Sequence, residues 1–153
     1  MAREYTFYGA ADTTSEHFRS VIAGAVGGSA GADGTIFVDG MYISAFSVDS
    51  AEKHSITRLF GFEHRVTAIF RFDNMSTPSI AEHNTVLMAI AVLAVFDAYA
   101  KPGVLLFNGE EAILQRLDDG VVFDAEWEEW AEIPDVGALM AAHSKRRLPQ
   151  PLL

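Results

Sequence analysis

The longest apolar pattern in the chain runs from Thr77 to Lys101. Its middle, Val86–Phe96, is eleven apolar residues in succession, so a helix here has no polar face and must be covered on most sides. Ser79 and Glu82 have capping-box spacing, which predicts the start of the helix, and Pro102-Gly103 ends it. The unbroken run is shorter than the roughly 20 residues that span a bilayer. The pattern therefore predicts the central helix of a small domain and no membrane segment.

A second helix is predicted near the N-terminus, and it has a single apolar stripe. Thr13 and Glu16 have capping-box spacing, and four apolar residues then recur at the i, i+3, i+4 and i+7 positions of one helical face: Phe18, Val21, Ile22 and Ala25. The glycine-rich residues 27–34 follow a helix and carry no lysine, unlike a phosphate-binding loop. We interpret them as a flexible connector.

Short alternating or apolar segments predict strands around the two helices. Asp39-Gly40 and Asn108-Gly109 are two-residue hairpin signals, and Asp118-Asp119-Gly120 is a further turn. The predicted strands are residues 4–8, 35–38, 41–48, 62–72, 104–107, 110–117 and 121–124. Residues 49–60 are ambiguous, and residues 135–142 predict a short helix. The order predicts an α+β fold, with a mostly antiparallel sheet packed on the long apolar helix and the N-terminal amphipathic helix.

Length and composition are those of one globular domain. The chain has 153 residues, of which half are apolar and 21% are charged. We predict a single domain over residues 1–144 and a flexible tail over residues 145–153. The absence of cysteine excludes disulfides and thiolate metal ligands. The first residues contain no apolar signal region, so a cytoplasmic protein is expected.

The charge distribution is uneven. The formal net charge is −10, which argues against nucleic acid as a partner. Ten of the 21 acidic residues lie between Glu110 and Asp135, opposed within that stretch only by Arg116. One interpretation is a docking surface for a basic protein, in which tryptophan would anchor the contact. The other is a solvated rim whose tryptophans complete the core. The predicted contacts are Asp118, Asp119, Glu126, Trp127, Glu128, Glu129 and Trp130.

The five histidines are scattered, and none belongs to an HExxH motif. His64 and His83 each follow a glutamate, and they would meet if the strand over residues 62–72 lay beside the start of the central helix. Such a site would suit a small metal-dependent hydrolase. Ordinary surface or half-buried histidines are the favoured interpretation, and no cofactor or metal ion is predicted.

Several local features recur together in one known family. Arg3-Glu4-Tyr5 opens the first strand, and Phe70–Asn74 ends a strand before the long helix. A short strand at Val104–Phe107, the segment Ile113–Gly120 and the acidic tryptophan segment follow. In this order the chain resembles the Sit-type (swapped inheritance of toxin) immunity proteins of bacteria. The resemblance covers most of residues 3–130 and departs in the glycine-rich connector and in residues 49–60.

The resemblance implies a function by binding. A protein of this family would be an antitoxin that occupies a toxin and blocks its action in the cytoplasm, and the family has no catalytic residues to carry over. An acidic surface would suit a basic toxin. Two alternatives from other classes remain: the metal-dependent hydrolase, and a structural homo-oligomer, such as a homodimer, whose exposed sheet face pairs with itself.

Overall fold

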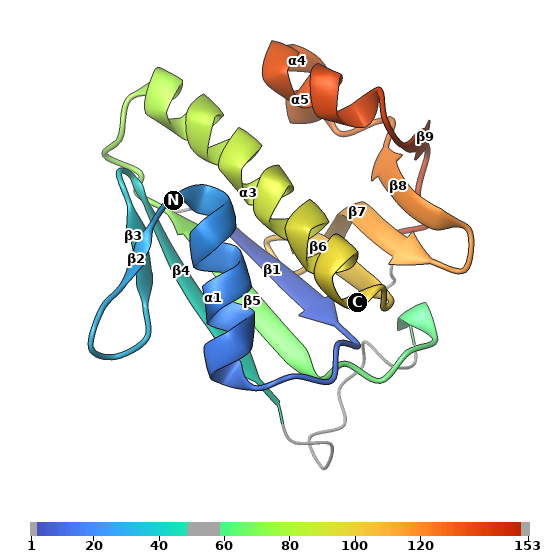
Figure 1. The fold of residues 1–153 in the computed structure, drawn as a ribbon. Coiled ribbons are helices and arrows are strands. Elements are labelled where there is room, and N and C mark those ends of the chain that lie inside the picture. The colour runs from blue at the N-terminus through green and yellow to red at the C-terminus, as the bar shows by residue number, and fades with distance from the viewer. Residues whose placement is uncertain (1–2, 49–58, 151–153) are drawn as a thin grey trace.

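A computed structural model describes residues 3–48 and 59–150. In this part of the chain, strands form one sheet in the order β2-β3-β4-β5-β1-β6-β7-β8-β9, with helices on one face (Figure 1). The helices are α1 (Ser15–Val26), α3 (Pro78–Tyr99), α4 (Glu128–Glu132) and α5 (Pro134–Met140). The strands are β1 (Glu4–Gly9), β2 (Ser29–Ala30), β3 (Ile36–Val38), β4 (Met41–Ser47), β5 (Val66–Phe72), β6 (Gly103–Phe107), β7 (Glu111–Leu117), β8 (Gly120–Asp124) and β9 (Ser144–Arg146).

The sheet is antiparallel at every described pairing except β8 with β9, which is parallel. The N-terminal strand β1 lies at its centre, where Tyr5 is opposite Phe70 on β5 and opposite Phe107 on β6. Side chains alternate between the two faces of a strand, so Tyr5 and Phe7 point to the same side. The prediction of an α+β fold with a mostly antiparallel sheet is confirmed.

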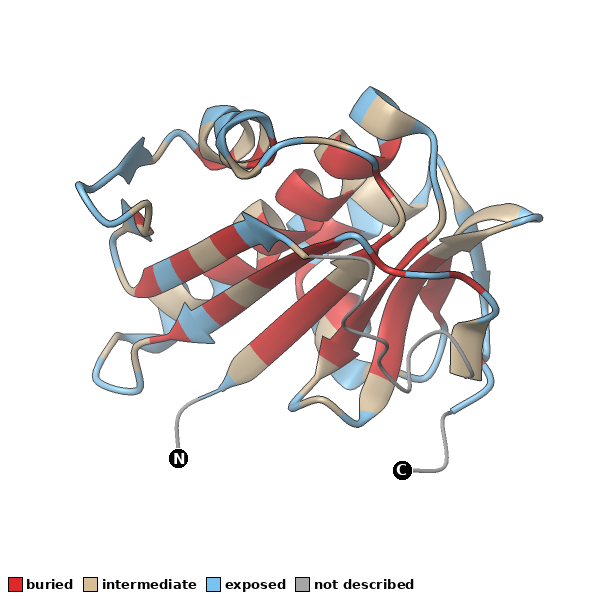
Figure 2. Cartoon of the chain, turned by 90° about the horizontal axis from the view of Figure 1, so that it is seen from below, coloured by how far each residue is buried: buried red, intermediate tan, exposed pale blue. Residues whose placement is uncertain are grey.

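The main core lies between the sheet and the two long helices (Figure 2). Helix α1 contributes Phe18 and Ile22, and α3 contributes Met88 and Phe96, all almost fully buried. The ring of Phe96 meets the ring of Phe7 edge-on, with centroids 5.6 Å apart. By length and composition alone α3 could cross a membrane, a test that core helices of globular proteins also pass. In this structure it is the predicted central helix, packed on the sheet.

Helices α1 and α3 each begin at a threonine, and in neither helix is it the residue that the capping-box spacing predicted. The Thr14 hydroxyl accepts a hydrogen bond from the backbone N–H of His17 (3.1 Å), and the Thr77 hydroxyl accepts one from Ile80 (3.3 Å). Pro78 then occupies the first turn of α3, where its missing N–H costs nothing. The capping predictions were therefore wrong by one residue for α1 and by two residues for α3.

The β3–β4 turn connects the hairpin to the start of α3. Gly40 in that turn has φ +83°, and a Cβ on it would lie 2.6 Å from the Cγ2 of Ile80. Only glycine satisfies both the backbone angle and the close approach. The glycine-rich connector differs from the prediction, because Ser29–Ala30 forms strand β2 beside β3. Of the ambiguous residues 49–60, residues 49–58 lie outside the described part of the chain.

The C-terminal residues extend the sheet and cover part of its second face. Strand β9 pairs with β8, and Leu148 is 1% exposed within a small apolar cluster that includes Phe62 and Val122. The side chain of Gln150 accepts a hydrogen bond from the N–H of Ala112 (2.7 Å) and donates one to its carbonyl (3.1 Å). Residues 145–150 thus differ from the flexible tail expected there, because apolar surface and strand pairing hold them.

Candidate functional site

Trp130 belongs to the hydrophobic core. It is 1% exposed, its indole N–H donates a hydrogen bond to the carbonyl of Ile113 (2.8 Å), and its ring meets Phe123 edge-on at 5.5 Å. Through these contacts Trp130 helps to hold the five-residue helix α4 over β7 and β8. Trp130 therefore agrees with the second interpretation of the acidic segment, in which the tryptophans complete the core.

Trp127 lies differently from its neighbour. It is half-buried at the N-cap of α4, and its ring centroid is 4.8 Å from that of Phe107. Its indole nitrogen is buried without a hydrogen-bond acceptor among the described residues. An indole N–H is a donor that normally finds a partner when buried. Of the two predicted tryptophan contacts, Trp127 is thus the one with surface available to another molecule.

Glu129 ties α4 to the N-terminal strand. One carboxylate oxygen accepts a hydrogen bond from the hydroxyl of the fully buried Tyr5 (3.0 Å), and the other is 2.8 Å from the guanidinium of Arg3. Burial, and next the charge of Glu129, raise the pKa of the Tyr5 phenol well above its ordinary value, so it stays a hydrogen-bond donor. Glu129 therefore has a structural role that the sequence did not suggest.

Two arginines that follow the sequence-predicted acidic stretch fold back against it. The guanidinium of Arg146 lies 2.6 Å from a carboxylate oxygen of Asp119 in the β7–β8 turn. The guanidinium of Arg147 lies 3.6 Å from a carboxylate oxygen of Glu126, just after β8. These pairs are exposed and weak, but they lower the local negative charge. Arg116, the residue expected to oppose the acids, instead donates a hydrogen bond to the carbonyl of Phe96 (2.9 Å).

The remaining predicted acids are free of such partners. Asp118 and Glu128 are exposed and make no ion pair with any other residue that the structure describes. Glu126 is exposed too, despite its weak pair. The structure therefore divides the predicted site into two structural supports, the buried Trp130 and the partly buried Glu129, and a set that is accessible to another molecule. The accessible set is Asp118, Asp119, Glu126, Trp127 and Glu128.

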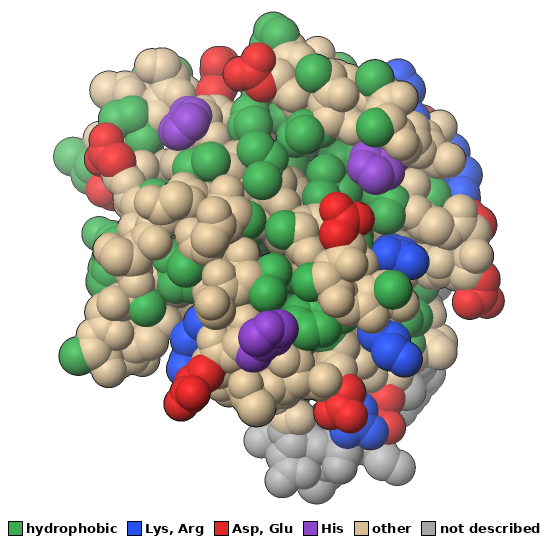
Figure 3. Space-filling model, in the orientation of Figure 1, with side chains coloured by type: hydrophobic (Ala, Val, Ile, Leu, Met, Phe, Trp, Pro, Cys, Tyr) green, Lys and Arg blue, Asp and Glu red, His purple; other side chains and the backbone are tan. Residues whose placement is uncertain are grey.

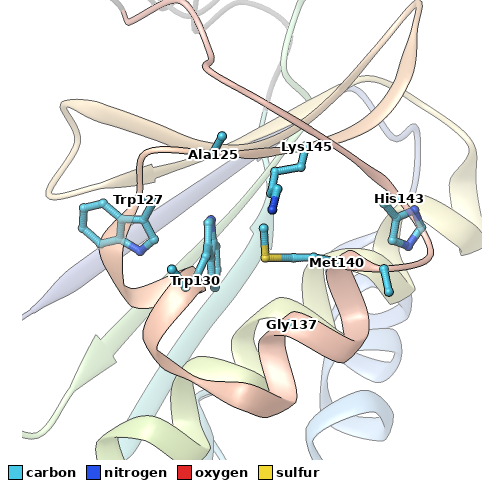
Figure 4. Close-up of a pocket in the computed structure, with 9 residues that line it drawn as sticks. Ala125, Trp127, Trp130, Gly137, Met140, His143 and Lys145 are labelled. Carbon is cyan, nitrogen blue, oxygen red and sulfur yellow. The ribbon is translucent and has the colours of Figure 1, made fainter.

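A pocket of about 530 Å³ opens beside these residues, between α4, α5 and β9. Figure 4 shows Trp130, Met140 and Lys145 converging on it, with Trp127 on one side and His143 on the other. The remaining wall consists of small residues, which leave the space open: Ala125, Ala131, Gly137 and Ala141. The pocket offers an aromatic and aliphatic surface to a side chain of another molecule. The sequence offered no spacing that would place Met140, His143 and Lys145 there.

The two histidines of the hydrolase hypothesis lie on opposite faces of the sheet. Phe7 contacts α3, so its neighbour Tyr8 on β1 points to the other face, and there the ring of Tyr8 meets that of His64 at 5.1 Å. His83 is exposed on α3. Within residues 3–48 and 59–150, no group of three or more His, Asp or Glu side chains is placed to hold a metal ion. The proposed meeting of the two glutamate–histidine pairs was wrong.

Comparison with known proteins gives a family for the chain. No curated protein and no solved structure matches it. The model of one protein family, described as SitI3-like, matches residues 3–134, which include every predicted contact residue and the elements from β1 to α4. That match covers well over half of the chain. The chain therefore belongs to the SitI3-like family of Sit immunity proteins.

Proposed function

We propose that this immunity protein neutralises a protein toxin in the cytoplasm, by binding it through the exposed surface around α4. The observation that carries the proposal is the open pocket lined by Trp127, whose sequence neighbours Glu126 and Glu128 are exposed. Membership in an immunity family supports binding rather than catalysis as the mode of action. The binding residues would be Asp118, Asp119, Glu126, Trp127 and Glu128.

The chemistry of this surface suits an apolar anchor set among basic residues. A side chain of the toxin would enter the pocket against the accessible surface of Trp127 and Met140. Lysine or arginine side chains around that anchor would meet Glu126 and Glu128. Opposite charge at the rim mainly raises the association rate and selects the partner. The net charge of −10 would steer a basic toxin toward the molecule over a longer range.

Charge reversal at Glu128 tests the proposal with a matched control. Glu128 and Glu63 are both exposed, and neither makes an ion pair with another described residue. Glu128→Lys and Glu63→Lys therefore change the net charge equally, but only Glu128 borders the proposed site. We expect Glu128→Lys to weaken toxin binding about tenfold or more, and Glu63→Lys to change it only through the overall charge.

The measurement is calorimetric or surface-based titration with the purified cognate toxin, at two salt concentrations. A double variant, Glu126→Lys with Glu128→Lys, should lose still more affinity while unfolding as cooperatively as the wild type. Equal affinities for the Glu63 and Glu128 variants would rule out the surface around α4. Cell fractionation would test the cytoplasmic location separately.

A further inference from the structure

Helix α3 keeps an apolar face that the described residues of the chain cover only in part. It is apolar on all sides, yet only 44% of its most apolar 18-residue window is buried. A helix of that kind normally has all its sides covered. Figure 3 shows hydrophobic side chains gathered over α3 and α5 on this face of the molecule. The half-exposed apolar residues in the middle of α3 are Val86, Leu87, Ile90, Leu93 and Ala94.

Two polar side chains, those of His83 and Asp97, flank the middle of this face at equal distances from Ile90 along the helix. His83 precedes Ile90 by seven residues, and Asp97 follows Ile90 by seven. A heptad drifts by only about 20° on a straight helix, so the three side chains lie along one line, with the outer two about 10.5 Å from the centre. His83 and Asp97 are exposed, and neither makes an ion pair with another residue in the described ranges.

We propose that this face of α3 binds a second copy of the chain, with the two α3 helices antiparallel across a twofold axis at Ile90. The twofold axis brings His83 opposite Asp97 of the partner subunit, and it repeats that pair at the other end of the contact. A parallel arrangement would instead place like residues together, with carboxylate against carboxylate. The imidazole of a histidine can donate a hydrogen bond to a carboxylate, whereas two carboxylates repel each other, so electrostatic complementarity favours the antiparallel dimer over the parallel one.

The spacing suits a shallow crossing of the two helices. Apolar residues at heptad positions pack at a crossing angle near 20°, which keeps neighbouring turns in contact on both sides of the axis. Leu87 and Leu93 lie three residues before and after Ile90, so they would extend the apolar contact to either side of it. The flanking helices expose small residues, which permit close approach. These are Ser20 and Gly24 on α1, and Ala138 on α5.

A charge swap tests this arrangement. His83→Asp alone would place two carboxylates together at each end, and we expect the dimer to dissociate about tenfold more readily. Asp97→His alone removes both carboxylates and should also weaken it. The double variant His83→Asp with Asp97→His has the composition and net charge of the wild type and exchanges the partners, so it should restore the dimer.

The measurement is the mass in solution by light scattering over a concentration series, against a chain mass of 16.7 kDa. Circular dichroism would confirm that each variant is folded. We expect twice the chain mass for the wild type and the double variant, and Ile90→Lys should be monomeric. A monomeric wild type would overturn the proposal, as would a double variant that fails to restore the dimer.

The dimer is independent of the proposed toxin contact, which lies around α4. Toxin titration with Ile90→Lys separates the two surfaces. Unchanged toxin affinity in a monomeric Ile90→Lys variant would support the dimer as the occupant of this face. Loss of toxin binding together with a monomeric wild type would assign the face to the toxin instead, and would end the proposal.

Discussion

Glu129 offers a sharp test of how the acidic segment is held in place. Its carboxylate accepts the hydrogen bond of the buried Tyr5 hydroxyl and pairs with Arg3, and so it connects two segments 124 residues apart. Glu128 is adjacent, exposed, and lies in the same first turn of α4. Both carboxylates therefore interact similarly with the helix dipole, and that contribution cancels when Glu129→Ala is compared with Glu128→Ala.

The expected difference in stability follows from two contacts. Glu129→Ala leaves the buried Tyr5 hydroxyl without its acceptor, which costs about 1–3 kcal/mol. The pair with Arg3 is partly exposed, with side chains 49% and 22% accessible, so it adds at most about 1 kcal/mol. We expect Glu129→Ala to lose about 2 kcal/mol of unfolding free energy, and Glu128→Ala to change it by about 0.5 kcal/mol or less.

Urea unfolding followed by far-ultraviolet circular dichroism is the assay. A loss of about 2 kcal/mol would move the midpoint by roughly 1 M urea at an unchanged slope. Glu129→Gln keeps a carbonyl oxygen for Tyr5 and removes the charge, so most of the stability should return. If Glu129→Ala and Glu128→Ala unfold at the same urea concentration, the hydrogen bond from Tyr5 to Glu129 makes no net contribution to stability.

Two further predictions concern the buried Trp130 and the partly buried Glu111. Trp130→Ala should lower the free energy of unfolding by about 3–5 kcal/mol, because it removes a large core side chain and a hydrogen bond. Trp130→Phe should lower it by less. Equal urea midpoints for the two variants would contradict this prediction. Partial burial, and next the charge of Asp124, raise the pKa of Glu111. A carboxyl group whose pKa is raised in the folded state makes the protein less stable as the pH rises and the group ionises. Glu111→Gln should therefore be more stable than the wild type at pH 7. That advantage should disappear below about pH 4, where the unfolded glutamate is also protonated, and a pH series of unfolding midpoints would test it.

The regular elements could be predicted because their signals are local. The eleven-residue apolar run of α3, the stripe of α1 and the glycine turns each lie within a few residues of the structure that they specify. The capping threonines show the limit of that approach. Neighbouring hydroxyls such as Thr13 and Thr14 offer nearly the same spacing, and only the path of the incoming chain selects one.

The sequence predicted part of the candidate site, and tertiary packing explains why it did not predict the rest. The sequence located the acidic tryptophan segment, but it could not separate Trp130, which fills the core, from Trp127, which stays half-exposed. Both lie in a short segment whose orientation depends on packing against β7 and β8. The basic run at residues 145–147 was a visible signal, but nothing local indicated that β9 would return it to the acids.

The sequence by itself determined the α+β class, the central helix and the concentration of negative charge, because apolar periodicity, turn residues and charge counts act over short distances. The tertiary structure alone decided which carboxylates are paired, which tryptophan is buried, and which face of α3 stays uncovered. Those outcomes depend on contacts between residues far apart in the chain, such as Tyr5 with Glu129 and Asp119 with Arg146. Such contacts are set by the packing of the whole domain, and no short stretch of sequence contains that information.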